Sequence, residues 1–184
     1  MSADEFLAWE RGQAVRHVFH RGEVFAMAGG SPRHARLAVR VASRLESALQ
    51  GRDCGTYSSD LQLDLDGAHF VYADAVVVCG PVLLRPGTKD VVTNPKLVVE
   101  VLSKSTEAYD RGMKQAAYLA LASVEHYVLV SQREPRVEVY TRQDADTFLY
   151  RAYVAGEVVA LDRVGARFAV DDVYAGAFEI PGDE

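Results

Sequence analysis

Two acidic residues stand inside apolar stretches of this 184-residue chain. Glu100 lies in the middle of residues 96–102, the most apolar strand-like stretch, and Asp74 interrupts residues 71–79. A buried carboxylate must be paired, protonated or bound to a cation, because leaving its charge unpaired costs several kcal/mol. If the two stretches form neighbouring strands, the carboxylates converge on one point. That is the simplest arrangement for a hard divalent cation, Mg²⁺ or Mn²⁺.

A lysine follows on the next predicted helix, which covers about residues 105–122. Asp110, Lys114 and Tyr118 line one edge of this helix at steps of four. From that edge Lys114 can reach inward and donate to a scissile phosphate or position a water. Two carboxylates, a cation and a lysine suit the hydrolysis of a phosphodiester, in which the metal polarises a phosphoryl oxygen and activates water. The buried face of the helix is predicted to hold Met113, Ala116, Ala117, Ala120 and Leu121.

Each of these residues also has a structural interpretation. Glu100 could form a buried salt bridge with Lys114 or an arginine, Asp74 could cap a turn, and Lys114 could pair with Asp110 at a spacing of four. Taken singly, the structural interpretation is favoured. Taken together, in this order and on these elements, the residues favour a catalytic site.

The pattern along the chain predicts a single domain over residues 1–184. Helices are predicted over residues 3–10, 31–50, 105–122 and 171–174. Strands are predicted over residues 14–19, 23–27, 61–65, 69–79, 96–102 and 126–131, with a final meander over 136–141, 147–153 and 157–160. This order predicts an α/β fold in which helices flank a mixed β-sheet that ends in a C-terminal β-meander.

The helix from Ser31 is the clearest element, with an N-cap serine, a proline at the first helical position and a glycine just after its end. Its apolar face holds Ala38, Val41, Ala42, Leu45, Ala48 and Leu49. The opposite side holds Arg33, Arg36, Arg40 and Arg44, which we interpret as a solvated face rather than a contact for nucleic-acid backbone. His34 is on the apolar side of the first turn, either as a satisfied core histidine or as a phosphate contact or proton-transfer group.

Composition bounds the remaining possibilities. A net charge of −6 counts against a sequence-independent nucleic-acid coat protein but not against a nuclease. No apolar run approaches the roughly 20 residues that span a bilayer, and the first residues lack a signal-peptide pattern, so we expect a cytoplasmic protein without membrane contact.

Cys54 and Cys79 lack metal-site spacing, and Cys79 is interpreted as a small buried hydrophobe. Asp60, Asp64 and Asp66 alternate with leucines and are predicted to face solvent.

Several motifs taken together resemble one family. They are YADAVVVC at residues 72–79, PKLVVEVLS at 95–103, DRGMK at 110–114 followed by Tyr118, GEVFAM at 22–27, His34, and EHYVLVS at 125–131. These motifs, spread over nearly the whole chain, are similar to those of the Uma2 ("Uma-two") family. That family is assigned to restriction endonucleases of the PD-(D/E)XK nuclease superfamily.

The resemblance implies roles for particular residues. Asp74 takes the position of the metal-binding aspartate and Glu100 that of the second acid. Leu102 stands where the superfamily has its lysine, which points to Lys114 as a lysine relocated to the next helix. Val18 occupies a position where the family has a glutamate, so this chain lacks one acidic residue of the pattern.

The leading hypothesis is therefore a Mg²⁺-dependent endonuclease that hydrolyses DNA and pairs as a homodimer. Asp74 and Glu100 would hold the metal, Lys114 would orient water and stabilise charge, and His34 and Tyr118 would assist. Two alternatives stay open: a catalytically inactive, nuclease-derived binding or assembly protein, and a hydrolase for another phosphoester.

Overall fold

The computed structural model describes residues 1–27 and 29–183. The helices are α1 (Ala3–Glu10), α2 (Pro32–Ala48), α3 (Glu107–Asp110), α4 (Met113–Ala120), α5 (Val170–Tyr174) and the 3-10 helix η1 (Ala177–Glu179). The strands are β1 (His17–His20), β2 (Glu23–Ala26), β3 (Cys54–Ser58), β4 (Gln62–Asp64), β5 (His69–Tyr72), β6 (Ala75–Cys79), β7 (Val91–Val92), β8 (Leu97–Val101), β9 (His126–Val130), β10 (Arg136–Arg142), β11 (Phe148–Val154), β12 (Val158–Leu161) and β13 (Ala166–Ala169).

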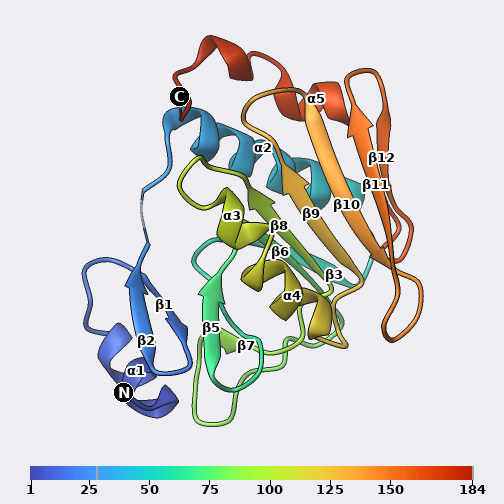
Figure 1. The fold of residues 1–184 in the computed structure, drawn as a ribbon. Coiled ribbons are helices and arrows are strands. Elements are labelled where there is room, and N and C mark those ends of the chain that lie inside the picture. Colours follow the sequence, from blue (N-terminus) through green and yellow to red (C-terminus); the bar gives the residue numbers. More distant parts are fainter. Residues whose placement is uncertain (28, 184) are drawn as a thin grey trace.

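The central feature of the described chain is a six-stranded sheet in the order β11-β10-β9-β8-β6-β3. Strand β8 is antiparallel to β6 and parallel to β9. Because a parallel pair needs a crossover connection, the chain passes over the sheet between β8 and β9, through α3 and α4 (Figure 1). Strands β8 and β9 are buried along their whole length. The expected α/β fold, a mixed sheet flanked by helices, is confirmed.

Helix α2 covers one face of this sheet. Ser31 caps it by accepting a hydrogen bond from the backbone N–H of His34 at 3.2 Å, and Pro32 occupies the first turn. Leu37, Val41 and Leu45 are fully buried in one cluster with valines of the sheet. This packing is the one that the apolar period of the helix predicts.

Helix α4 lies over the opposite face, and here the predicted burial is only partly correct. The expected single helix is split into α3 and α4, with the break at residues 111–112. Ala117 and Leu121 pack against the core as predicted, whereas Met113 is 58% exposed and the buried side chains of α4 are Lys114 and Tyr118. The reason lies in β8, where Glu100 is on the face that α4 covers. The helix therefore turns two hydrogen-bond donors toward the sheet.

A smaller sheet, five-stranded within the described residues, has the order β2-β1-β5-β4-β7. The strand expected over residues 69–79 is in fact two strands, β5 in this sheet and β6 in the larger one. The chain changes sheets at Ala73 and Asp74. Asp74 is bound to β8 at this point, since its backbone N–H donates to the Val99 carbonyl at 3.1 Å and its Oδ2 accepts from the Val101 N–H at 2.7 Å.

The predicted solvent face of β4 is also corrected. Asp60 and Asp66 are exposed, but Asp64 is 8% exposed and Gln62 5%. Asp64 is buried because Arg85 covers it, with Nη1 2.7 Å from its Oδ2. An alternating strand exposes one face only when no other segment packs on it.

The C-terminal region agrees with the expected meander through β9, β10 and β11, which pair antiparallel in succession. Strand β12 does not continue this sheet, because it pairs with β13 in a separate hairpin. The arginine stripe of α2 is a solvated face only in part. Arg36 is exposed, but Arg33 donates to the Ile180 carbonyl at 3.1 Å and Arg40 to the Asp172 carbonyl at 3.1 Å, so these two arginines anchor the C-terminal segment.

Cys54 and Cys79 form a disulfide. The interpretation of Cys79 as a free buried hydrophobe is therefore wrong. The antiparallel register of β3 and β6 places the two cysteines directly opposite each other. Their separation of 25 residues does not reveal this pairing. Among the described residues, no helix has both the length and the apolar character needed to cross a bilayer.

Candidate active site

A cavity of about 430 Å³ lies where the two sheets meet. Its walls come from the β1–β2 hairpin, the first turn of α2, the sheet change at Asp74, the end of β8, and helices α3 and α4. His34, Asp74, Glu100 and Lys114 all line it. Tyr118 is fully buried behind Glu100. The fold thus brings the five residues singled out in the sequence to one place.

Glu100 is a buried acid of the cavity wall. Its side chain is 5% exposed, and its Oε1 is 2.7 Å from the Lys114 ammonium and accepts a 2.9 Å hydrogen bond from the Tyr118 hydroxyl. Burial raises the pKa of Glu100 to about 8, an effect that Lys114 opposes and that the charges of Asp110 and Asp74 reinforce. The Glu100 carboxyl therefore keeps its proton at neutral pH, and a further positive charge beside it would favour the ionised form.

Lys114 is buried with its ammonium among oxygen atoms. Besides Glu100, the ammonium contacts Asp110 Oδ1 at 3.6 Å and donates to the backbone carbonyl of Tyr72 at 3.1 Å. Burial acts to lower the pKa of Lys114, but Glu100 and Asp110 outweigh it and the pKa is raised. The lysine stays charged and its direction is fixed by contacts from three different elements, β8, α3 and β5. It points into the cavity from α4, as the spacing along that helix predicts.

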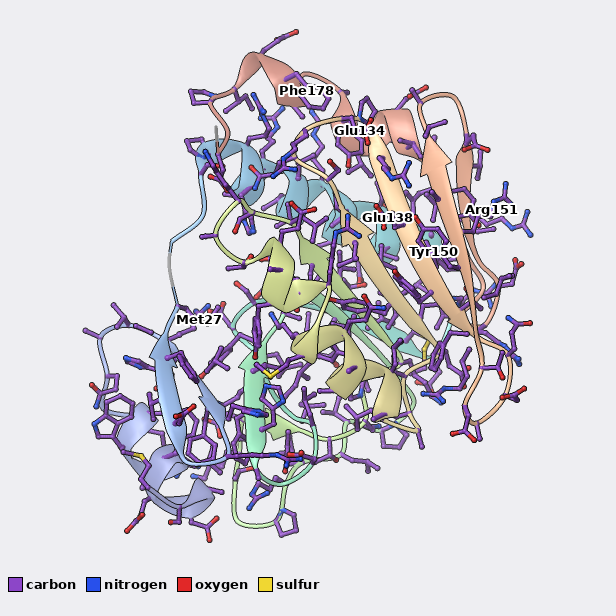
Figure 2. The ribbon with its side chains drawn as sticks, in the orientation of Figure 1. Met27, Glu134, Glu138, Tyr150, Arg151 and Phe178 are labelled. Atoms are coloured by element: carbon purple, nitrogen blue, oxygen red, sulfur yellow. A yellow bond between two sulfur atoms is a disulfide. The ribbon has the colours of Figure 1, made fainter. Side chains whose placement is uncertain are left out.

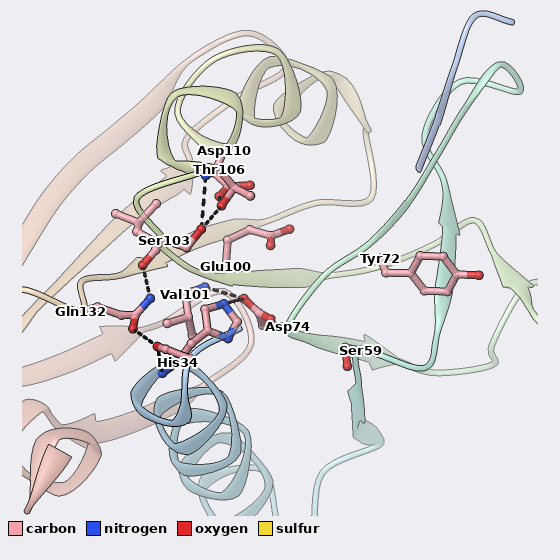
Figure 3. A network of polar contacts seen from close by, with 12 residues as sticks. His34, Ser59, Tyr72, Asp74, Glu100, Val101, Ser103, Thr106, Asp110 and Gln132 are labelled. Carbon is pink, nitrogen blue, oxygen red and sulfur yellow. Dashed lines mark hydrogen bonds and ion pairs between the residues drawn. The ribbon is translucent and has the colours of Figure 1, made fainter. Parts of the chain in front are cut away.

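Asp74 and His34 form the second part of the site (Figure 3). Nε2 of His34 is 3.4 Å from Oδ2 of Asp74, the oxygen that also accepts from the Val101 N–H. Burial acts to lower the pKa of His34, but the hydrogen bond and charge of Asp74 outweigh it, so the pKa is raised. His34 is thus a partner of the site aspartate and not an isolated core histidine.

A network of hydroxyl groups supports the site from α3. Thr106 donates from Oγ1 to Oδ2 of Asp110 at 2.6 Å, and its hydroxyl lies 2.8 Å from that of Ser103 (Figure 3). Tyr127 donates to the Asp110 carbonyl at 2.9 Å. Asp110 is therefore held facing Lys114, which limits how far the lysine can move. Sequence spacing places Asp110 near Lys114, but it does not indicate this network.

The acids of the site offer oxygen ligands for a divalent cation. Asp74, Glu100 and Asp110 are three acids around one permanent cation, Lys114, and with its pKa at about 8 Glu100 becomes negatively charged when it gives up its proton to bind a cation. Among the described residues, no group of three or more histidine, cysteine or acidic side chains has the geometry of a metal cage. A site with two carboxylates and several waters suits Mg²⁺, which dehydrates reluctantly and is commonly bound through one or two protein carboxylates.

The cavity also contains residues that the sequence analysis missed or left open. Val18 lines it from β1, so the position where the family pattern has an acid does face the site. Glu23 is exposed on β2 and does not replace that acid at the described cavity wall. Tyr109 lines the wall and its hydroxyl lies 3.0 Å from Nε2 of His69, whose pKa burial lowers to about 4. No periodicity or motif indicates these contacts, because they depend on how the two sheets meet.

The fold, a mixed sheet between helices, is similar to that of a solved nuclease-like protein. A crystal structure described as a putative nuclease belonging to DUF820, from Anabaena variabilis, matches it with a TM-score of 0.77 over 96% of this chain and 99% of that one, at 14% identity. The family described as "Uma2: Putative restriction endonuclease" matches residues 3–170. The chain belongs to the Uma2 family.

Two relatives come from Synechocystis sp. (strain PCC 6803). One, called an uncharacterized protein, is 37% identical over 177 residues, which is 96% of this chain and 92% of that protein. A second uncharacterized protein is 29% identical over 143 residues, or 77% of this chain and 81% of the relative. The similarity covers nearly the whole chain, and the names of these relatives assign no activity.

Proposed function

We propose that this protein is a divalent-metal-dependent endonuclease that hydrolyses phosphodiester bonds in DNA. The observation that carries the proposal is the buried contact between Glu100 and Lys114 in the cavity that Asp74 also lines. Membership of a restriction-endonuclease family supports the same reaction class. The two carboxylates would hold Mg²⁺ or Mn²⁺, which when bound polarises a phosphoryl oxygen and makes its water a stronger nucleophile.

The remaining residues would position and balance charge. Lys114, held by Glu100, Asp110 and the Tyr72 carbonyl, would donate to the scissile phosphate or orient the attacking water. Tyr118 would hold the Glu100 carboxylate in one orientation through its hydroxyl. His34, positioned by Asp74, would contact the phosphate or transfer a proton.

One observation favours a second candidate, a nuclease-derived protein that binds or assembles without cutting. Val18 contributes an apolar side chain to the cavity wall where the family pattern has an acid. If that acid is a necessary ligand in relatives, its loss weakens the metal site. The candidate predicts an intact fold without measurable affinity for divalent cations.

The test is metal-dependent cleavage. Wild-type protein, Asp74→Asn and the control Asp162→Asn are incubated with supercoiled plasmid, single-stranded DNA and RNA, each with Mg²⁺, Mn²⁺ or EDTA. Asp162 is an exposed acid that pairs with Arg167 on the surface, so it matches the change of charge without touching the cavity. We expect cutting that needs metal, is lost in Asp74→Asn and is kept in Asp162→Asn. Cutting by Asp74→Asn at the wild-type rate would contradict the proposal, and no cutting together with no metal binding would favour the second candidate.

We also propose that the protein pairs as a homodimer through β11. This strand is at the edge of the large sheet, and Leu149, Tyr150 and Val154 are exposed along it. Figure 2 labels Tyr150 on this strand. An uncovered edge strand with apolar side chains is a template for pairing with a second strand. Light scattering of purified protein at micromolar concentration tests this, since a monomer mass throughout would refute it.

A further inference from the structure

Five apolar or aromatic side chains line the cavity together with its charged residues. Val18, Phe25 and Met27 contribute from the hairpin side, and Tyr109 and Met113 contribute from α3 and α4. Met27 is at the end of β2 (Figure 2). The cavity therefore combines the charged contact of Glu100 and Lys114 with aromatic and thioether side chains, and the Lys114 ammonium lies 5.9 Å from the centre of the Tyr109 ring.

Two of these apolar side chains are exposed although a core is available nearby. Phe25 is 52% exposed and Met113 is 58% exposed, and both border the cavity. Single exposed apolar residues are common on protein surfaces. A group of apolar residues that surrounds a concave site together with a few charged residues is typical of a ligand pocket. At about 430 Å³, the space is within the range of pockets that enclose one small molecule.

The charged and the apolar side chains of the cavity together indicate the class of ligand. A phosphodiester at Asp74, Glu100 and Lys114 carries a sugar and a base within a few ångströms. A base is flat and has π faces that stack on aromatic side chains, and such stacking tolerates any base. The phenylalanine and tyrosine in the apolar walls suit that group. We infer that the apolar and aromatic side chains of the cavity wall receive the base of one unpaired nucleotide, so that the preferred substrate is single-stranded or locally unpaired nucleic acid.

The charges around the cavity argue against a paired strand as the preferred substrate. Binding of duplex DNA depends on lysines and arginines that neutralise successive phosphates. Among the described residues that line the cavity, Lys114 is the one lysine or arginine, and it is buried beside two acids. A base inside a duplex is also stacked and paired, and it enters a pocket only after the cost of unpairing is met. The inference rests on the proposed function for the position of the phosphate and adds the substrate class.

Binding without cleavage tests the pocket. Fluorescence anisotropy in EDTA gives the Kd of labelled single-stranded DNA, single-stranded RNA and a fully paired DNA duplex. The proteins are wild type, Phe25→Ala, Met113→Ala and the control Leu83→Ala. Leu83 is 55% exposed in the loop between β6 and β7 and does not line the cavity, so it matches the loss of an exposed apolar side chain. Because Phe25 and Met113 are exposed, their variants should fold, which circular dichroism verifies.

We expect single strands to bind at least tenfold more tightly than the duplex, and Phe25→Ala to weaken single-strand binding by about tenfold or more, with Leu83→Ala unchanged. Equal or tighter duplex binding, no effect of Phe25→Ala and Met113→Ala, or no binding to any probe would overturn the inference. Cleavage of the same substrates with Mg²⁺ separates the two proposals. If both variants retain metal-dependent cutting of the duplex, the base-binding pocket is refuted and the nuclease activity is supported. If single-strand binding depends on the pocket but nothing is cut, the pocket is supported and the nuclease activity is refuted.

Discussion

Metal binding should release a proton from Glu100. The carboxyl of Glu100 faces Lys114, Tyr118 and Asp110, and its pKa is raised by burial to about 8, with Asp110 and Asp74 adding to the rise and Lys114 opposing it. A carboxyl group coordinates a cation in its ionised form, so binding must remove the proton wherever it is present. The experiment therefore varies the pH and measures how many protons are released when one cation binds.

The magnitude follows from the pKa. With a pKa of about 8, roughly one Glu100 in eleven is ionised at pH 7, so each cation that binds at pH 7 releases about 0.9 proton. Affinity should rise about tenfold for each pH unit below 8 and level off above it. The direction is fixed, because a higher pH makes the ionised ligand more available.

Isothermal titration with Mn²⁺ in buffers that differ in ionisation enthalpy measures both quantities between pH 6 and pH 9. In Glu100→Gln, which keeps the side-chain shape but cannot titrate, the affinity should be weaker and should lose the dependence on pH assigned to this group. Constant affinity across this range with no proton release in the wild-type protein would refute the reasoning that Glu100 is a buried, protonated ligand.

Four further predictions concern stability, each measured by urea unfolding without metal. The pKa of Glu100 in the folded protein is above its usual 4.5, so the stability that this group contributes is present below about pH 4.5 and is lost as pH rises through 8. Glu100→Gln should therefore reduce this fall in stability with pH. An unchanged pH dependence in the variant would contradict the raised pKa. Lys114→Met should lower the free energy of unfolding at neutral pH by about 3–5 kcal/mol, because it removes the cation beside the buried Asp110 carboxylate and the ammonium that contacts Glu100; a loss under about 1 kcal/mol would count against it. Tyr118→Phe removes one buried hydrogen bond and should lower the free energy of unfolding by about 1–3 kcal/mol. An unchanged free energy would show that the hydroxyl does not bond to Glu100. Cys54→Ser should cost about 3 kcal/mol and reducing agent should destabilise the wild type equally, whereas free thiols in the unreduced protein would show that the bond to Cys79 is not formed.

Much of the site could be predicted from the sequence because its chemistry conflicts with its surroundings. Glu100 interrupts an apolar strand, and Asp110, Lys114 and Tyr118 follow one helical edge, so each stands out locally. The fold places these side chains at 2.7–3.6 Å contacts around Lys114 and Glu100. The roles of Asp74 and Glu100 in metal binding stay predictions until binding is measured.

Other features were beyond local patterns because they depend on tertiary packing. Residues 69–79 read as one strand, since nothing in an apolar run indicates that a chain leaves one sheet for another at Asp74. The alanine-rich side of α4 looked like its buried face because the charged partner, Glu100, is on a distant strand. The disulfide depends on the register of β3 and β6, and Asp64 is buried by Arg85 from a loop. In each case a long-range contact overrides the local signal.

The central claim is that Asp74 and Glu100 hold one divalent cation. Anomalous diffraction from crystals soaked in Mn²⁺ tests it most directly, since it locates the metal independently of activity. We predict one strong peak in the cavity, about 2.1–2.3 Å from a carboxylate oxygen of each acid, that disappears in Asp74→Asn. A cavity without a peak at saturating Mn²⁺, or a peak bound only by other residues, would contradict the claim.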